Sequence, residues 1–110
     1  MTRPVPRSLQ EIWRVGCAEE PLSDIEREHF RNLARSRFYT FRLGMEHAQA
    51  SDDEKRTASL IAGFVTELNN HPGLERVWRA SEFVRDPAAG DVERSLAERR
   101  AGPADDATIH

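Results

Sequence analysis

Residues 23–49, SDIEREHFRNLARSRFYTFRLGMEHAQ, have the pattern of one long amphipathic helix. The apolar side chains follow one another at intervals of three or four residues, which keeps them on one face of a helix with about 3.6 residues per turn. They are Phe30, Ala34, Phe38, Phe41, Met45 and Ala48. Ser23 and Glu26 have the spacing of a capping box, which predicts where this helix begins. This stretch predicts the central helix of an all-α protein.

A second helix with a matching apolar face follows after a short turn at about residues 50–52. Ser51 and Glu54 again have capping-box spacing, and the apolar pattern ends near residues 69–70. The apolar face consists of Ala58, Ile61, Phe64, Val65 and Leu68. Because so short a connection makes neighbouring helices antiparallel, we expect an αα-hairpin at the centre of the protein.

Shorter helices should flank this hairpin. A first helix is predicted over Ser8–Ala18, and Trp13 should pack on the long helix, since so short a helix is marginal alone. Pro72 suits the first turn of another helix, which we expect to continue to about residue 84, with a bend at Ser81. A last, polar helix over residues 92–100, capped by Asp91, should be loosely attached.

These patterns together predict an all-α fold, a small helical bundle of four to five helices around a long antiparallel αα-hairpin. The expected organisation is a flexible N-terminus (1–7), a helical domain (8–86), a linker with the polar C-terminal helix (87–103) and a disordered tail (104–110).

Composition narrows the classes of function. The 110 residues suit one domain, and a net charge of −3 argues against a surface that grips nucleic acid throughout. The single cysteine, Cys17, excludes an internal disulfide framework and favours a reducing compartment. No targeting segment is visible, and the longest apolar run, residues 60–65, is far below the ~20 residues of a membrane span. We expect a soluble, cytoplasmic protein without membrane contact.

The long helix also carries a row of arginines. Arg27, Arg31, Arg35 and Arg42 recur at intervals typical of one helix face, which we call the arginine ridge, and Tyr39 lies nearby. Guanidinium groups neutralise phosphates, and a tyrosine ring can stack on a base. The alternative is a solvated face, because residues 23–49 hold five arginines against four acidic residues. The ridge and Tyr39 are therefore the candidate phosphate-binding or partner-binding residues.

Catalytic and metal-binding patterns are incomplete. Glu26 and His29 have the Glu-x-x-His spacing of di-iron bundles, but the second such motif is missing. Cys17 has no histidine partner at a fixed spacing, and no glycine-rich phosphate loop is present. We expect no catalytic residue, no metal, no cofactor and no enzymatic activity.

Three motifs resemble an uncharacterised family of small helical bacterial proteins. They are Leu9-Gln10-Glu11-Ile12-Trp13, residues 22–30 with Phe38-Tyr39-Thr40-Phe41, and Pro72-Gly73 followed by Trp78. The resemblance covers about residues 9–84 and implies an all-helical fold with no known activity. This chain departs from the family in two respects: many members carry an N-terminal membrane anchor, which we do not expect here, and Arg42 stands where they tend to have an acid.

The function that we expect is a non-enzymatic interaction through the surface of the hairpin, with a second copy or with another protein as the partner. So small a chain has few elements to cover both sides of a hairpin, and an uncovered apolar stripe usually marks a partner face. The alternative is that the other helices cover it fully. In the competing class of function, the arginine ridge binds nucleic acid or phosphate.

Overall fold

The computed structural model describes the backbone of residues 6–108 and the side chains of residues 6–101. Within that range the chain forms five α-helices, one 3₁₀ helix and no strand, which confirms the predicted all-α class. The elements are α1 (Leu9–Cys17), α2 (Asp24–Ala50), α3 (Glu54–Asn70), α4 (Pro72–Arg79), the 3₁₀ helix η1 (Glu82–Arg85) and α5 (Pro87–Thr108). Among these residues, none of the helices combines the length and apolar character needed to cross a membrane.

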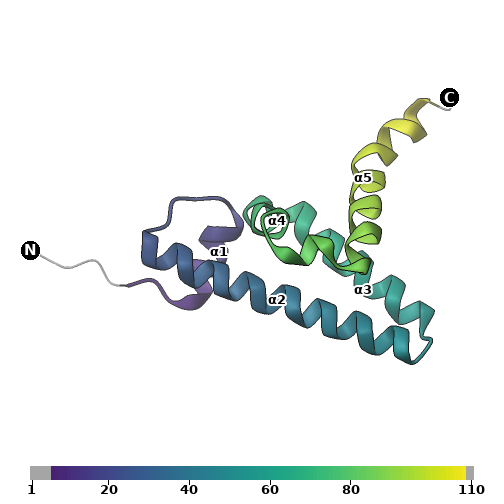
Figure 1. Cartoon of the computed structure of the whole chain (residues 1–110). Coiled ribbons are helices and arrows are strands. Elements are labelled where there is room, and N and C mark those ends of the chain that lie inside the picture. Colours follow the sequence, from purple (N-terminus) through teal and green to yellow (C-terminus); the bar gives the residue numbers. More distant parts are fainter. Residues whose placement is uncertain (1–5, 109–110) are drawn as a thin grey trace, which may run out of the picture.

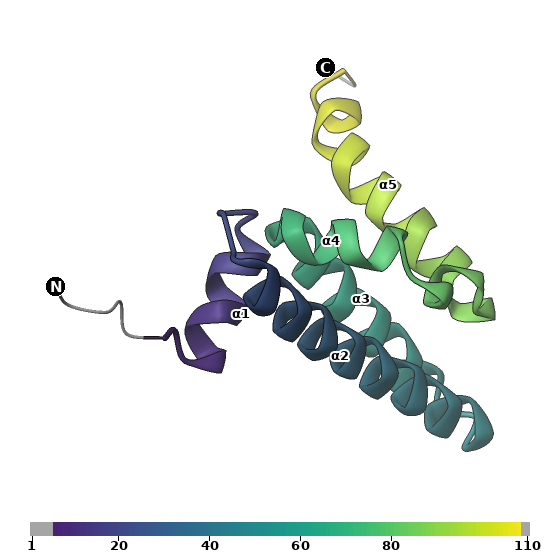
Figure 2. The ribbon, with the colours of Figure 1, turned by 60° about the vertical axis from the view of Figure 1, so that its left-hand side comes forward.

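The long helices α2 and α3 run side by side in opposite directions and form the centre of the fold (Figure 1). All six apolar residues predicted on the inner face of α2 are at most 4% exposed. On α3, Phe64, Val65 and Leu68 are buried as predicted, whereas Ala58 is exposed. Figure 2 shows α1 beside the N-terminal half of α2 and α4 above the hairpin. The amphipathic periodicity of the sequence therefore identifies the faces that pack.

Aromatic rings fill the space between these helices. Phe38 is the hub, with its ring centroid 6.0 Å from Phe64, 5.2 Å from Trp78 and 5.8 Å from Phe83, each near edge-on. Such tilted pairs contribute about 0.5–1.5 kcal/mol beyond the area that they bury. Phe38 thus joins α2, α3, α4 and η1 in one core.

The turns after α1 and α2 share one backbone motif, which was not predicted from the sequence. Glu19 and Asp52 have positive φ angles of 59° and 52°, and each follows the last turn of a helix. The next amide reaches back to the helix, as when the Asp53 N–H donates to the Ala48 carbonyl at 2.9 Å, which is a Schellman motif. This motif makes Asp53 the N-cap of α3, so the capping box predicted at Ser51 and Glu54 is wrong.

The caps of the two preceding helices match the sequence more closely. At α2 the Ser23 hydroxyl accepts from the Glu26 N–H, and the Glu26 carboxylate accepts from the Ser23 N–H, so that the predicted capping box is complete. At α1 the Ser8 hydroxyl accepts from the Glu11 N–H at 3.1 Å and caps the start of the helix. Trp13 of this helix packs on Phe30 of α2, with centroids 5.6 Å apart, as predicted.

Helices α1 and α4 approach each other through two glycines. A Cβ on Gly73 would lie 2.9 Å from the carbonyl carbon of Gly16, and a Cβ on Gly16 would lie within 2.6 Å of the Phe30 ring. No side chain larger than hydrogen fits either position without moving a helix or the ring. The two glycines therefore set the distance between α1, α4 and the start of α2.

The C-terminal third differs most from expectation. Helix α4 ends at Arg79 rather than near residue 84, because Ser81 adopts an extended backbone conformation and its hydroxyl donates to the Trp78 carbonyl at 2.7 Å. The predicted linker at 87–90 belongs to α5, which begins at Pro87. The helix extends through Thr108, beyond the predicted end at residue 100. Of the predicted flexible segments, residues 1–5 and 109–110 lie outside the described residues.

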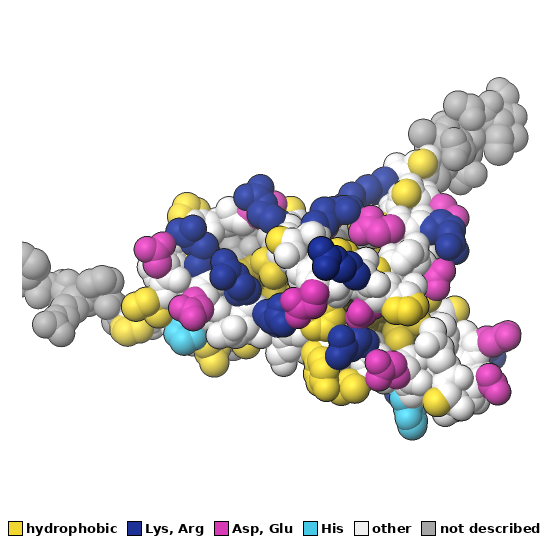
Figure 3. Space-filling view, viewed as in Figure 1, with side chains coloured by type: hydrophobic (Ala, Val, Ile, Leu, Met, Phe, Trp, Pro, Cys, Tyr) yellow, Lys and Arg dark blue, Asp and Glu magenta, His cyan; other side chains and the backbone are white. Residues whose placement is uncertain are grey.

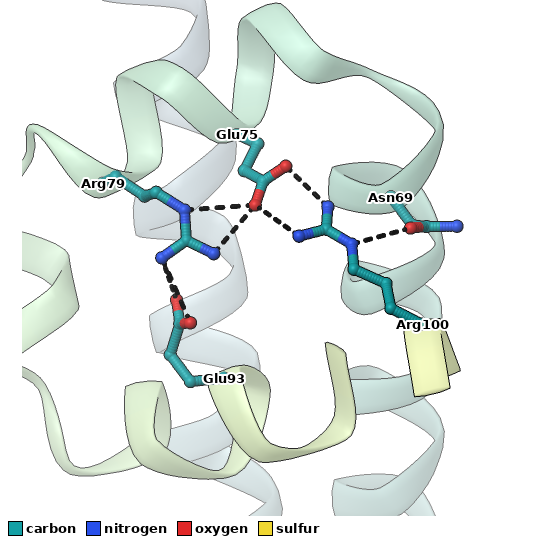
Figure 4. A network of polar contacts seen from close by, with 5 residues as sticks. All are labelled: Asn69, Glu75, Arg79, Glu93 and Arg100. Carbon is teal, nitrogen blue, oxygen red and sulfur yellow. Dashed lines mark hydrogen bonds and ion pairs between the residues drawn. The ribbon is translucent and has the colours of Figure 1, made fainter. Parts of the chain in front are cut away.

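Helix α5 is anchored rather than loosely attached. Ala89, Val92 and Leu96 are at most 2% exposed against the core. A polar network continues the contact (Figure 4): Glu75 of α4 accepts from Arg79 at 2.8 Å and from Arg100 of α5 at 2.7 Å. In the same network, Arg79 also pairs with Glu93, and Arg100 donates to Asn69 of α3. The network ties α3, α4 and α5 together.

Candidate functional site

The arginine ridge lies on the flank of α2 that faces α4 and η1. Figure 3 shows Lys and Arg side chains over this part of the molecule, with acidic side chains among them and hydrophobic atoms visible between them. Arg35 forms a hydrogen-bonded ion pair with Glu82 of η1, and Arg42 lies 3.8 Å from Asp86, just after η1. The ridge therefore holds η1 against the hairpin.

Ion pairing changes the electrostatics of this flank. The hydrogen bond from Arg35 lowers the pKa of Glu82, and the Glu82 carboxylate raises the pKa of Arg35, so that both groups are charged at neutral pH. Arg27 pairs with Asp24 at 3.1 Å. Much of the positive charge predicted for the ridge is therefore balanced by acids, two of which come from a segment distant in sequence.

Tyr39, which was predicted to bind a ligand beside the ridge, is only partly free to contact one. Its side chain is 48% exposed, and the guanidinium of Arg42 lies 5.2 Å from its ring centroid. The same guanidinium lies 5.4 Å from the ring of Phe83. Arg42 is thus held between two aromatic rings and an acid, which is the arrangement of a structural cation–π contact.

A groove opens beside the ridge, between the α1–α2 loop, α2 and α4. It has a volume of about 650 Å³, and the lining includes three ridge arginines together with Arg76 of α4. The three are Arg27, Arg31 and Arg35. Arg42 and Tyr39 do not line it, so the structure brings together only part of the predicted set.

Glu26, the acid of the Glu-x-x-His spacing, has a structural role. The Glu26 carboxylate accepts from the Ser23 N–H at 2.9 Å and pairs with Arg7 at 3.3 Å. The capping hydrogen bond is the main reason that the pKa of Glu26 is lowered. Across the described part of the chain, no three His, Cys, Asp or Glu side chains gather as a metal site requires.

Cys17 is a buried residue of the hydrophobic core. Its side chain is 2% exposed, and burial, with a smaller contribution from Glu67, raises the pKa of its thiol to about 11. Since the thiolate is the nucleophilic form, the Cys17 thiol is held in its unreactive state at neutral pH.

A second stripe on α2, of which only Tyr39 was predicted from the sequence as a binding residue, points away from the core. Its residues recur every three or four positions, all are exposed, and none is Asp, Glu, Lys or Arg. We call it the outer stripe: Ile25, His29, Asn32, Ser36, Tyr39, Leu43 and His47. The signal was available in the sequence as a second periodicity, out of phase with the apolar one.

Comparisons with protein families, with curated proteins and with solved structures find no match to this chain. The resemblance to small helical bacterial proteins therefore stays a prediction. What the protein does has to be inferred from its own side chains and surfaces.

Proposed function

We propose that the protein is a non-enzymatic helical interaction module whose partner, a second copy or another protein, binds the outer stripe of α2. The observation that carries the proposal is the absence of charged residues from this solvent-facing stripe, in a chain with 32% charged residues. The stripe belongs to the surface of the central hairpin, opposite the core.

The distribution of charge on α2 is unusual for a helix whose outer face contacts only water. A helix that packs on a core by one face normally carries charged residues on the opposite face. None of the nine charged residues of α2 lies on the outer stripe. The cores of protein interfaces are depleted in charge and enriched in aromatic and large apolar residues. The outer stripe likewise lacks Asp, Glu, Lys and Arg, and it includes Ile25, Tyr39 and Leu43.

Large apolar side chains on the stripe are also exposed. Ile25 is 70% exposed and Leu43 46%, while Leu9 of α1, 55% exposed, extends the surface sideways. A shallow depression of about 450 Å³ lies between α1 and α2, and Ser36 belongs to both it and the outer stripe. The stripe and the depression form one continuous surface that a partner side chain could enter.

The experiment tests both kinds of partner. The molar mass of the purified protein in solution is measured by light scattering, and the tagged protein is used for capture from its native lysate. Leu43→Glu places a charge at the stripe, and it should abolish the dimer or the captured partner while helicity by circular dichroism is unchanged. Ser59→Glu, at an exposed position of α3, is the matched control and should leave binding intact. A monodisperse monomer that captures nothing would contradict the proposal.

Nucleic-acid or phosphate binding through the arginine ridge ranks second. The ion pairs of Arg35 and Arg42 weigh against it, because a phosphate would have to displace Glu82 and Asp86. Electrostatic binding is strongest at low salt, so binding of RNA or DNA is measured there. Salt-dependent binding that Arg31→Glu with Arg35→Glu abolishes would favour this alternative, and no binding at low salt would exclude it.

A further inference from the structure

The groove between the α1–α2 loop, α2 and α4 has the size of a small-molecule site. Its volume of about 650 Å³ falls within the ~300–1,000 Å³ of typical ligand pockets. It lies on the α4 side of α2, whereas the outer stripe faces away from the core, so the two surfaces can be tested separately.

The floor of this groove is apolar and fixed in place. Leu22, Phe30 and Val77 line it, and the Phe30 ring packs against both Gly16 and Trp13. Because Phe30 is only 4% exposed, its ring cannot turn into the groove without disturbing the core. An apolar ligand body would therefore meet a preformed surface.

The rim of the groove is cationic. Arg27, Arg31, Arg35 and Arg76 line it against two acids, Glu19 and Glu20. Arg31 forms no ion pair with any residue that the structure describes. Its guanidinium carries hydrogen-bond donors arranged in a fork that matches a carboxylate or a phosphate.

Two further arginines can join Arg31 at little cost. Arg76 pairs with Glu19 at 2.9 Å and Arg27 pairs with Asp24 at 3.1 Å, but these two arginine side chains are 77% and 62% exposed. Exposed pairs of this kind contribute little, about 0–1 kcal/mol, so an anion in the groove can exchange with the acids.

We propose that the groove binds a small amphipathic anion, with an apolar body on the floor of Leu22, Phe30 and Val77 and one carboxylate or phosphate group held by Arg31 and Arg76. Charge complementarity selects the anion, and the buried aromatic floor selects the apolar body. A nucleic-acid backbone would use the charge but leave the floor uncovered. The proposal does not rest on the interaction assigned to the outer stripe.

The test is calorimetric titration of the full chain with four probes: decanoate and decyl phosphate below their critical micelle concentrations, decanol below its solubility limit, and inorganic phosphate. The first two should bind, whereas decanol and inorganic phosphate, which each lack one half of the ligand, should bind at least tenfold more weakly. A preference between decanoate and decyl phosphate would identify the head group as carboxylate or phosphate.

Variants assign the binding to the groove. Arg31→Ala should lower the affinity for the anionic probe that binds more tightly by about tenfold, as expected for the loss of a hydrogen bond between charged groups. Arg56→Ala removes an exposed arginine of α3 outside the groove and should have no effect. Three results would each overturn the proposal: neither anionic probe binds at about 1 mM, decanol or inorganic phosphate binds as tightly as they do, or the two variants behave alike.

Discussion

Replacing Gly73 by alanine should separate α4 from α1. The added Cβ would lie 2.9 Å from the carbonyl carbon of Gly16 and 3.2 Å from that of Cys17, and it would overlap the Gly16 carbonyl oxygen. Carbon atoms in good contact are about 3.5–4.0 Å apart, so α4 would have to move by more than half an ångström. Both sides of the clash are main chain, and neither can rotate away as a side chain could.

The expected loss is about 3 kcal/mol in the free energy of unfolding, the upper end of the usual range for overpacking. That is a large share of the ~5–15 kcal/mol that stabilises a typical domain. Because Leu74 and Trp78 of α4 are buried in the same core, the movement would also loosen their packing.

Urea unfolding followed by circular dichroism measures this loss, and Gly63→Ala is the matched control. A Cβ on Gly63 would have no neighbour within 4 Å, and the residue lies inside α3, so alanine there should stabilise the protein by about 0.5–1 kcal/mol. Glycine-to-alanine substitution should thus lower the free energy of unfolding at Gly73 and raise it at Gly63. If Gly73→Ala were as stable as the wild type, the close approach of α1 and α4 would be refuted.

Three further predictions concern single side chains. Glu75→Gln should lower the free energy of unfolding by about 1–2 kcal/mol at pH 7, because it weakens the pairing of a carboxylate that is 15% exposed. Arg100, followed by Arg79, holds the pKa of Glu75 below its ordinary value of 4.5. The wild type should therefore lose this stability as the pH falls below about 4.5, whereas the variant should not. Parallel curves of the free energy of unfolding against pH for the two proteins would contradict this. Asp52→Gly should raise the melting temperature, with a gain of about 0.5–1 kcal/mol, since the positive φ angle of 52° suits glycine; an unchanged temperature would argue against the Schellman motif. Cys17 should react with a thiol reagent at pH 8 at least about a hundredfold more slowly in the native than in the unfolded chain, and equal rates would show that its thiol is neither buried nor raised in pKa.

The hairpin could be predicted from sequence because its determinants are local. Phe30 and Phe38 fall on one face through the helical period alone, and the Ser23 box involves residues three positions apart. The same reasoning misplaced the start of α3, because the Schellman motif depends on a positive φ angle at Asp52. Glycine is the usual sequence signal for that angle, and an aspartate does not predict it.

The candidate site was harder to predict because its determinants are distant in sequence. Two of the acids that balance Arg35 and Arg42, Glu82 and Asp86, come from η1 and the residue after it, and only the tertiary fold brings them to the ridge. Arg76, in the same way, joins the groove from α4. The sequence pattern correctly located the arginine ridge on α2, but it could not show which of its charges stay available for a ligand.

The central claim, that the outer stripe of α2 is a binding face, is tested most directly by site-specific photo-crosslinking in the native cell. A photoreactive residue is introduced in place of Ser36 on the stripe and, as the control, in place of Ser59 on α3. If the stripe binds a partner, position 36 should give one covalent product of defined mass, either a dimer of this chain or a complex with one other protein. Position 59 should give none. The absence of a product from position 36, or the same products from both positions, would contradict the claim.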